Sequence, residues 1–229
     1  MNHSHPTELR DRIGPWQVVI ATLLAVCGAI VITLLPAPAI AADAAAWKHA
    51  AETFAAARAG KDDAIERAAG QWRALSEADP TDPVARAYAG AATAMQAKTT
   101  MLPWRKLSYA DDGLAMIDKA LAQVAAASDS ISPSGVAVGL ETRFVAATTF
   151  LALPSMFNRG ARGAKLLDEL VRNPQFAAAP AGFRAAVWLR AGDLALAEQR
   201  AADARQWFER AAASGAPQAA LAQARLKSL

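Results

Sequence analysis

Helix-forming segments separated by helix breakers make up almost the whole chain after residue 41, and this feature limits the fold most. Alanine, leucine, arginine, glutamate and glutamine dominate there, whereas runs of β-branched residues are scarce. These residues have high helix propensity, so the sequence predicts an all-α fold. The breaks divide the chain into expected helices at residues 43–59, 61–78, 83–99, 106–125, 135–152, 159–172, 181–198, 200–214 and 217–228.

Two of the breaks carry recognisable helix-end chemistry. In the first, Pro80 stops one helix, while Asp82 can cap the next helix and Pro83 can occupy its first turn. In the second, Gly215 closes one helix and Pro217 begins another. We therefore expect antiparallel helix pairs joined by short turns.

The C-terminal pair shows a specific spacing. Trp188, Gly192, Ala204, Phe208 and Ala211 follow one another at intervals of 4, 12, 4 and 3 residues. This spacing resembles the tetratricopeptide repeat (TPR), a helix–turn–helix unit of about 34 residues. The resemblance implies that two helices approach closely at Gly192, and that Phe208 is an aromatic wedge between small residues.

A fainter copy of the same spacing occurs earlier in the chain. Ala68, Trp72 and Pro80 fit a second helix with its closing proline, and Gly90 fits the next unit. The resemblance implies a TPR-like solenoid of about four helix pairs plus a C-terminal capping helix, in a domain covering residues 43–229. The alternative is a generic alanine-rich bundle of helical hairpins.

The repeat becomes irregular in the middle of the chain. The expected second-helix residues Gly113, Ile117 and Ala120 arrive about eleven residues late, after the surplus segment KTTMLPWRKLSYADDG at residues 98–113. That segment resembles short bacterial envelope proteins of repeat type, whose molecular role is not defined. A second feature of the same resemblance consists of Arg143, Thr148 or Thr149, Leu153-Pro154 and Phe157-Asn158-Arg159.

The uncharged run from Val18 to Leu35 predicts export of the domain that follows. Its length approaches that of a membrane-spanning helix, which favours a transmembrane anchor at residues 16–36. Ala39-Ile40-Ala41 instead suits a signal-peptide cleavage site that would close a signal segment at residues 16–41. Cleavage is the favoured alternative. Under both, residues 1–15 are cytoplasmic and the domain lies in the periplasm, either free or anchored to the inner membrane.

Composition narrows the possible chemistry. The single cysteine, Cys27, lies inside the apolar run, so the exported domain has no disulfide or thiolate metal site. The 24 basic and 21 acidic residues give a net charge of +3 and are interspersed. A nucleic-acid partner would require a basic stripe or block, and we expect none.

One candidate partner-binding surface is the cluster of Trp104, Arg105, Lys106 and Tyr109 in the surplus segment. An exposed aromatic residue beside two cations could hold a partner segment or contact lipid headgroups. Tryptophan is usually buried, however, so the favoured interpretation is that Trp104 fills the groove between two helix pairs.

A second candidate is an anion site at Arg159, Arg162 and Lys165. These cations recur every third residue on one side of an expected helix start, where free N–H groups attract anions. A solvated cationic face is the more common explanation of such a pattern.

Catalytic and metal-binding constellations are not predicted. His49 is the only histidine in the exported domain, which leaves metal ligation and serine–histidine chemistry without donors. Ser155 lacks a glycine-flanked elbow, and the adjacent Asp111 and Asp112 suit a helix start better than acid–base work. Glu141 is the remaining isolated acid, and we expect it to pair with Arg143 or Lys165. We therefore predict no enzyme activity and no cofactor.

The function expected from the sequence is a scaffold or adaptor that binds another protein or peptide at the periplasmic face of the inner membrane. The alternative is a lipid- or small-molecule-binding accessory of an envelope transport system, which would use an apolar tunnel between the helices.

Overall fold

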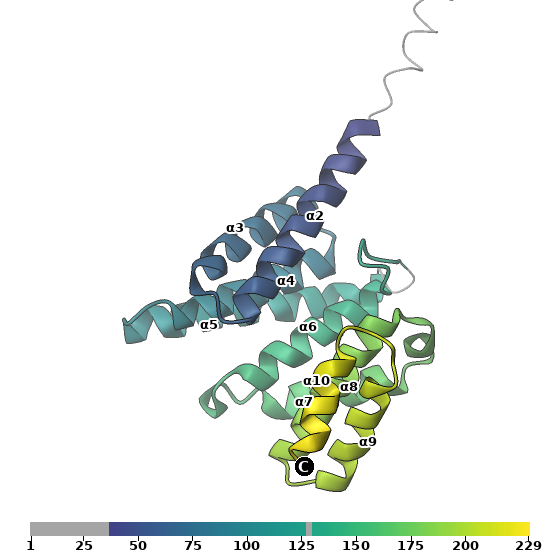
Figure 1. The fold of residues 1–229 in the computed structure, drawn as a ribbon. Coiled ribbons are helices and arrows are strands. Elements are labelled where there is room, and N and C mark those ends of the chain that lie inside the picture. Colours follow the sequence, from purple (N-terminus) through teal and green to yellow (C-terminus); the bar gives the residue numbers. More distant parts are fainter. Residues whose placement is uncertain (1–36, 127–129) are drawn as a thin grey trace, which may run out of the picture. The chain divides into compact units, whose positions relative to one another are not determined.

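The protein is all-α over the residues that the structure, a computed structural model, describes, which are 37–126 and 130–229 (Figure 1). The helices are α2 (Ala37–Arg58), α3 (Asp62–Ala78), α4 (Pro83–Met95), α5 (Pro103–Gln123), α6 (Val138–Ala152), α7 (Gly160–Arg172), α8 (Ala181–Ala197), α9 (Ala201–Ala212) and α10 (Ala219–Lys227). Short 3-10 turns lie at Gln96–Lys98, Val124–Ala126, Ser155–Phe157 and Pro174–Ala178. The predicted all-α class is thereby confirmed.

Two helices begin earlier than the sequence predicts. α2 begins at Ala37 and contains Pro38 in its first turn, where a proline removes no intrahelical hydrogen bond. α5 begins at Pro103 for the same reason, so the segment expected to be a turn is the first turn of a helix. None of the described helices is long and apolar enough to cross a membrane. Residues 16–36 of the predicted anchor or signal segment lie outside the described residues, whereas the predicted cleavage motif at residues 39–41 lies in α2.

The predicted cap at the start of α4 is confirmed. The Asp82 side chain accepts hydrogen bonds from the backbone N–H groups of Val84, at 2.7 Å, and Ala85, at 3.2 Å. Pro83 is the first helical residue. Gly215 adopts a φ of +68° between α9 and α10, a left-handed conformation that glycine reaches without steric cost.

Consecutive helices pack as pairs, α4 with α5, α6 with α7 and α8 with α9. A small residue lies at the contact in each pair. A Cβ atom at Gly113 would come within 2.5 Å of the Gly90 carbonyl oxygen, and one at Gly192 within 2.4 Å of the Phe208 ring. Gly163 of α7 similarly lies against Ala147 and Phe150 of α6. These contacts let the helix backbones approach closely and fix the register of each pair.

The residues that carry the repeat resemblance lie in the interior. Trp72, Ala204, Phe208 and Ala211 are fully buried, Gly90 and Gly192 are buried, and Trp188 is half-buried. Trp72 stacks on Tyr88 with ring centroids 4.3 Å apart, inside a cluster of apolar residues from α2, α3 and α4. Two further clusters follow along the chain, around Phe150 and around Phe208.

Candidate binding groove

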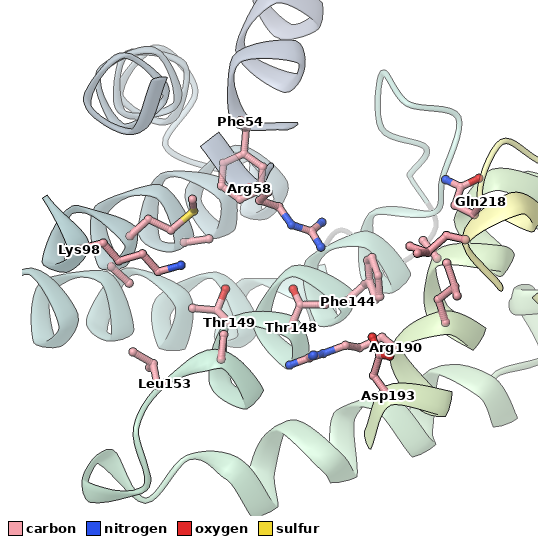
Figure 2. A pocket seen from close by; sticks show the side chains of 17 residues that line it. Phe54, Arg58, Lys98, Phe144, Thr148, Thr149, Leu153, Arg190, Asp193 and Gln218 are labelled. Carbon is pink, nitrogen blue, oxygen red and sulfur yellow. The ribbon is translucent and has the colours of Figure 1, made fainter. Parts of the chain in front are cut away.

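A groove of about 450 Å³ lies between alternate helices of the chain, α2, α4, α6, α8 and α10 (Figure 2). It is partly open to solvent. Its apolar lining consists of Phe54, Ala91, Ala94, Met95, Phe144, Ala152, Leu153, Ala186, Leu189 and Leu221. Its polar lining consists of Arg58, Lys98, Thr148, Thr149, Arg190, Asp193 and Gln218.

Helical periodicity explains why each helix contributes one stripe of side chains. The lining residues of α6 recur at 144, 148 and 152, with 149 and 153 beside them. Those of α8 recur at 186, 189, 190 and 193, and the stripe at 91, 94, 95 and 98 has the same intervals. Residues three and four apart share one face of a helix, so every helix turns a single face toward the groove. Nothing in the local sequence shows that these faces meet.

Arg58 and Arg190 place two guanidinium groups in this groove. Figure 2 shows them reaching in from opposite sides, from the end of α2 and from α8. Neither forms an ion pair with any residue that the structure describes, and the Arg190 Nε is buried without a hydrogen-bond partner. Burial lowers the pKa of Arg190; the charge of Asp193 opposes this effect, and the charge of Arg58 adds to it. The two cations are therefore close enough to repel each other.

The one acidic side chain of the groove is already paired. Asp193 Oδ1 lies 3.3 Å from Nε of Arg225, which projects from α10. Thr148 and Thr149 both donate their hydroxyl hydrogen to the Val145 carbonyl, at 3.0 and 2.8 Å. Within the described part of the chain, Arg58, Lys98 and Arg190 therefore form no ion pair and add positive charge to a groove with apolar walls.

The predicted anion site at Arg159, Arg162 and Lys165 faces acidic side chains of the protein itself. Arg159 Nη2 lies 2.9 Å from Asp118 Oδ2, and Arg162 binds the other oxygen of the same carboxylate. Both guanidinium groups lie over the Phe150 ring, 5.4 and 5.2 Å from its centroid. Lys165 is 3.9 Å from Glu169. The two arginines thus tie α7 to α5 through an internal anion.

The predicted partner surface at Trp104 lies in the first two turns of α5 and does not line the groove. Trp104 is 65% exposed, so the interpretation that it fills a groove between helix pairs is wrong. The physical reason is length: α5 has 21 residues and α4 has 13, so the first turns of α5 have no partner helix along α4. Arg105 and Lys106 are exposed, Tyr109 is half-buried, and Met101, Leu102 and Leu107 are exposed beside them.

Glu141 pairs with hydroxyl groups, and the expectation of a partner at Arg143 or Lys165 is wrong. The buried carboxylate accepts hydrogen bonds from Ser132, from Ser134 at 2.7 Å and from Tyr88 at 3.1 Å. Burial raises the pKa of Glu141, and these hydrogen bonds partly offset the effect. Arg143 instead donates to the Gly139 carbonyl. The carboxylate joins the segment before α6 to α4.

The remaining candidates stay isolated. His49 is exposed on α2, Ser155 is exposed, and Asp111 and Asp112 are exposed on α5. Across residues 37–126 and 130–229, no group of three His, Cys, Asp or Glu side chains is placed to hold a metal ion. Comparisons of the chain with protein-family models, with curated proteins and with solved structures found no match.

Proposed function

We propose that the protein is an exported, non-enzymatic scaffold of TPR-like helix pairs that binds a segment of another protein in the groove between α2, α4, α6, α8 and α10. The observation that carries this proposal is the lining of the groove. One face of each of five helices contributes to it, and its apolar side chains lie beside three cations that form no ion pair with a described residue. A concave surface of this kind suits an extended segment that is anchored by apolar side chains and oriented by a few polar contacts.

The positive charge of the groove indicates which residue types the bound segment contains. Three cationic side chains line it, while its only carboxylate is held by Arg225. A segment with acidic and large apolar residues would therefore complement both the charge and the walls. Export, inferred from the apolar run at residues 18–35, would place this interaction in the periplasm, and a retained anchor would raise the local concentration of the scaffold at the membrane.

A small molecule or lipid is the second candidate for the groove. A volume of about 450 Å³ falls within the range of small-molecule sites. The seven polar residues of the lining and its opening to solvent suit a peptide better than a lipid tail, which would require a closed apolar tunnel.

Selection from a random peptide library tests the proposal. The full-length chain in lipid nanodiscs would be panned against displayed peptides, and binding would be measured again with the groove filled. Thr148→Trp fills its centre, and Leu221→Trp places the same bulk at 53%-exposed Leu221, where folding is not at risk. Gln223→Trp is the matched control, because Gln223 is an exposed residue of α10 that does not line the groove.

We expect the selected peptides to bind the wild type and Gln223→Trp alike, and to lose at least about tenfold in affinity in both groove variants. Equal binding by all four proteins would place the peptide site elsewhere and overturn the proposal. Failure to select any peptide, together with a lipid or small molecule that native mass spectrometry finds in the wild type and not in Leu221→Trp, would favour the second candidate.

A further inference from the structure

We infer that Arg58 and Arg190 form a carboxylate-binding site within the groove, and that its ligand is an aspartate or glutamate side chain of the bound segment. This inference rests on the proposed function and deepens it, since it names the residue type that the groove recognises and the two side chains that recognise it.

The first argument is the unpaired charge. A half-buried guanidinium group normally has an anionic partner or a full set of hydrogen bonds, because burial without them is costly. Arg190 has neither: its Nε is buried without an acceptor, and the nearest groove carboxylate, Asp193, is engaged by Arg225. Arg58 approaches from α2 and adds a second positive charge. An anion between the two groups would supply the missing acceptor of Arg190 and a counter-charge to the exposed Arg58.

The second argument comes from the other arginine pair of the protein. Arg159 and Arg162 hold the two oxygens of Asp118 and lie over the ring of Phe150. The groove contains the same kinds of groups, two guanidinium groups with the aromatic rings of Phe54 and Phe144 in the same lining, but its one carboxylate, Asp193, is paired with Arg225. Guanidinium groups match a carboxylate through two parallel hydrogen bonds, which favours arginine over lysine in such a site.

The third argument concerns the position of the pair. In Figure 2, Lys98 lies on one side of the two arginines and Gln218 on the other, so the groove continues in both directions. A chain lying along it would pass the arginines with residues on either side, which suits an acidic side chain better than a terminal carboxylate. The Asp193 carboxylate also lies in this groove and would repel a doubly charged phosphate more than a singly charged carboxylate.

The test combines variants of the protein with variants of a selected peptide. Arg58→Gln and Arg190→Gln each remove one guanidinium group, and Arg205→Gln makes the same charge change at an exposed residue of α9 outside the groove. We expect the two groove variants to weaken binding about tenfold to a hundredfold, as for charged hydrogen bonds, and Arg205→Gln to change it less than about twofold. Replacing the acidic residue of the peptide by its amide should weaken binding to the wild type equally, and should have almost no further effect in the double variant Arg58→Gln, Arg190→Gln.

Three outcomes of this experiment would overturn the inference. Peptides that depend on the groove but are insensitive to the arginine variants would remove the carboxylate site while leaving the proposed function intact. Peptides that lose affinity only when their C-terminus is amidated would assign the site to a terminal carboxylate. Loss of affinity in Arg205→Gln as large as in the groove variants would reduce the effect to net charge.

A probe without a peptide backbone separates the inference from the proposed function. N-acetylaspartate at millimolar concentration should raise the melting temperature of the wild-type chain and leave that of Arg190→Gln unchanged. This result would support the carboxylate site even if no displayed peptide bound. A larger shift with inorganic phosphate than with N-acetylaspartate, or the same shift in Arg190→Gln, would contradict it.

Discussion

Two arginine pairs in this protein differ in what lies between their guanidinium groups. Arg159, the residue just before α7, and Arg162, on α7, share the carboxylate of Asp118 from α5. Arg58 and Arg190 come from α2 and α8 and line one groove, where the one acidic side chain, Asp193, is paired with Arg225. The first pair joins two helices of the fold, whereas the second leaves its charge available to a ligand.

The difference shows that a cationic sequence pattern alone does not locate an anion site. The regular spacing of Arg159, Arg162 and Lys165 is the clearer pattern in the sequence. In the structure, however, Asp118 pairs with the two arginines and Glu169 lies beside the lysine. Arg58 and Arg190 belong to no pattern. Among the described residues, neither forms an ion pair, and the one acidic side chain of their groove, Asp193, is paired with Arg225; this arrangement is a property of the tertiary structure.

The largest change in the free energy of unfolding is expected when the Asp118 carboxylate is removed. Asp118→Asn leaves Arg159 and Arg162 side by side without their acceptor and should lower the free energy of unfolding by about 1–2 kcal/mol, since the side chains are only partly exposed. Asp168→Asn is the control, because it breaks an exposed ion pair with Arg172 on a single helix and should cost less than about 0.5 kcal/mol. Chemical denaturation measures both. Equal losses would mean that the Asp118 pair is an ordinary surface interaction.

Glu141 differs from Asp118 in that its hydrogen-bond partners are hydroxyl groups and not arginines. Its pKa is raised by burial, so the folded protein holds this proton to a higher pH than the unfolded chain does. Stability contributed by the protonated form is therefore complete below the ordinary glutamate pKa of about 4.5 and is lost as pH rises from there through the folded-state pKa.

The variant Glu141→Gln should lack this dependence. Its free energy of unfolding relative to the wild type should increase as the pH rises above about 4.5, and should become constant above the folded-state pKa of Glu141. The total increase should be about 1.4 kcal/mol for each unit by which the folded-state pKa of Glu141 exceeds its unfolded-state pKa. Melting curves between pH 4 and pH 8 check this expectation. A constant difference over the whole range would show that Glu141 titrates as it does in the unfolded chain.

A smaller change, a gain in the free energy of unfolding, is expected when Arg190 of the groove is replaced. Arg190→Gln removes the repulsion by Arg58 and the burial of an unpaired charge, so the unliganded protein should gain about 0.5 kcal/mol of stability. The same variant should bind acidic peptides less well, which would make stability and binding change in opposite directions. Arg205→Gln should change neither. A loss of stability in Arg190→Gln would instead assign Arg190 a structural role like that of Arg159.

The smallest effect is expected at the exposed cations of α5. The double variant Arg105→Gln, Lys106→Gln should alter the free energy of unfolding by less than about 0.5 kcal/mol, because both side chains are exposed in helical turns without a neighbouring helix. Fluorescence polarisation should find unchanged affinity for groove-binding peptides. A loss as large as in Arg190→Gln would make the Trp104, Arg105 and Lys106 cluster the partner contact instead.

Much of the fold was predictable because it depends on neighbours in sequence. Helix formers, a capping aspartate at Asp82 and breakers such as Pro80 act within one or two turns, so the helices were placed to within a few residues. The early start of α5 was missed because Pro103 is compatible with both a turn and a first helical turn. The exposure of Trp104 was missed because it depends on where α4 ends.

The groove was not predictable, since its lining is drawn from five helices. Each contributes an unremarkable stripe, such as Thr148 and Ala152 on α6 or Ala186 and Arg190 on α8. The i, i+4 intervals could have revealed a common face on each helix. They could not have shown which faces point toward one another.

By itself, the sequence determined the helical class, the positions of the helix ends and the small residues that allow close pairing, because each of these depends on backbone propensity and local sterics. Only the tertiary structure decided which charges are neutralised. Asp118 reaches Arg159 and Arg162, and Glu141 reaches Tyr88 and two serines. Arg58 and Arg190 form no ion pair with any described residue, since Asp193, the carboxylate of their groove, is paired with Arg225. Electrostatic pairing depends on distance in space between residues far apart in the chain, and packing of the helices sets that distance.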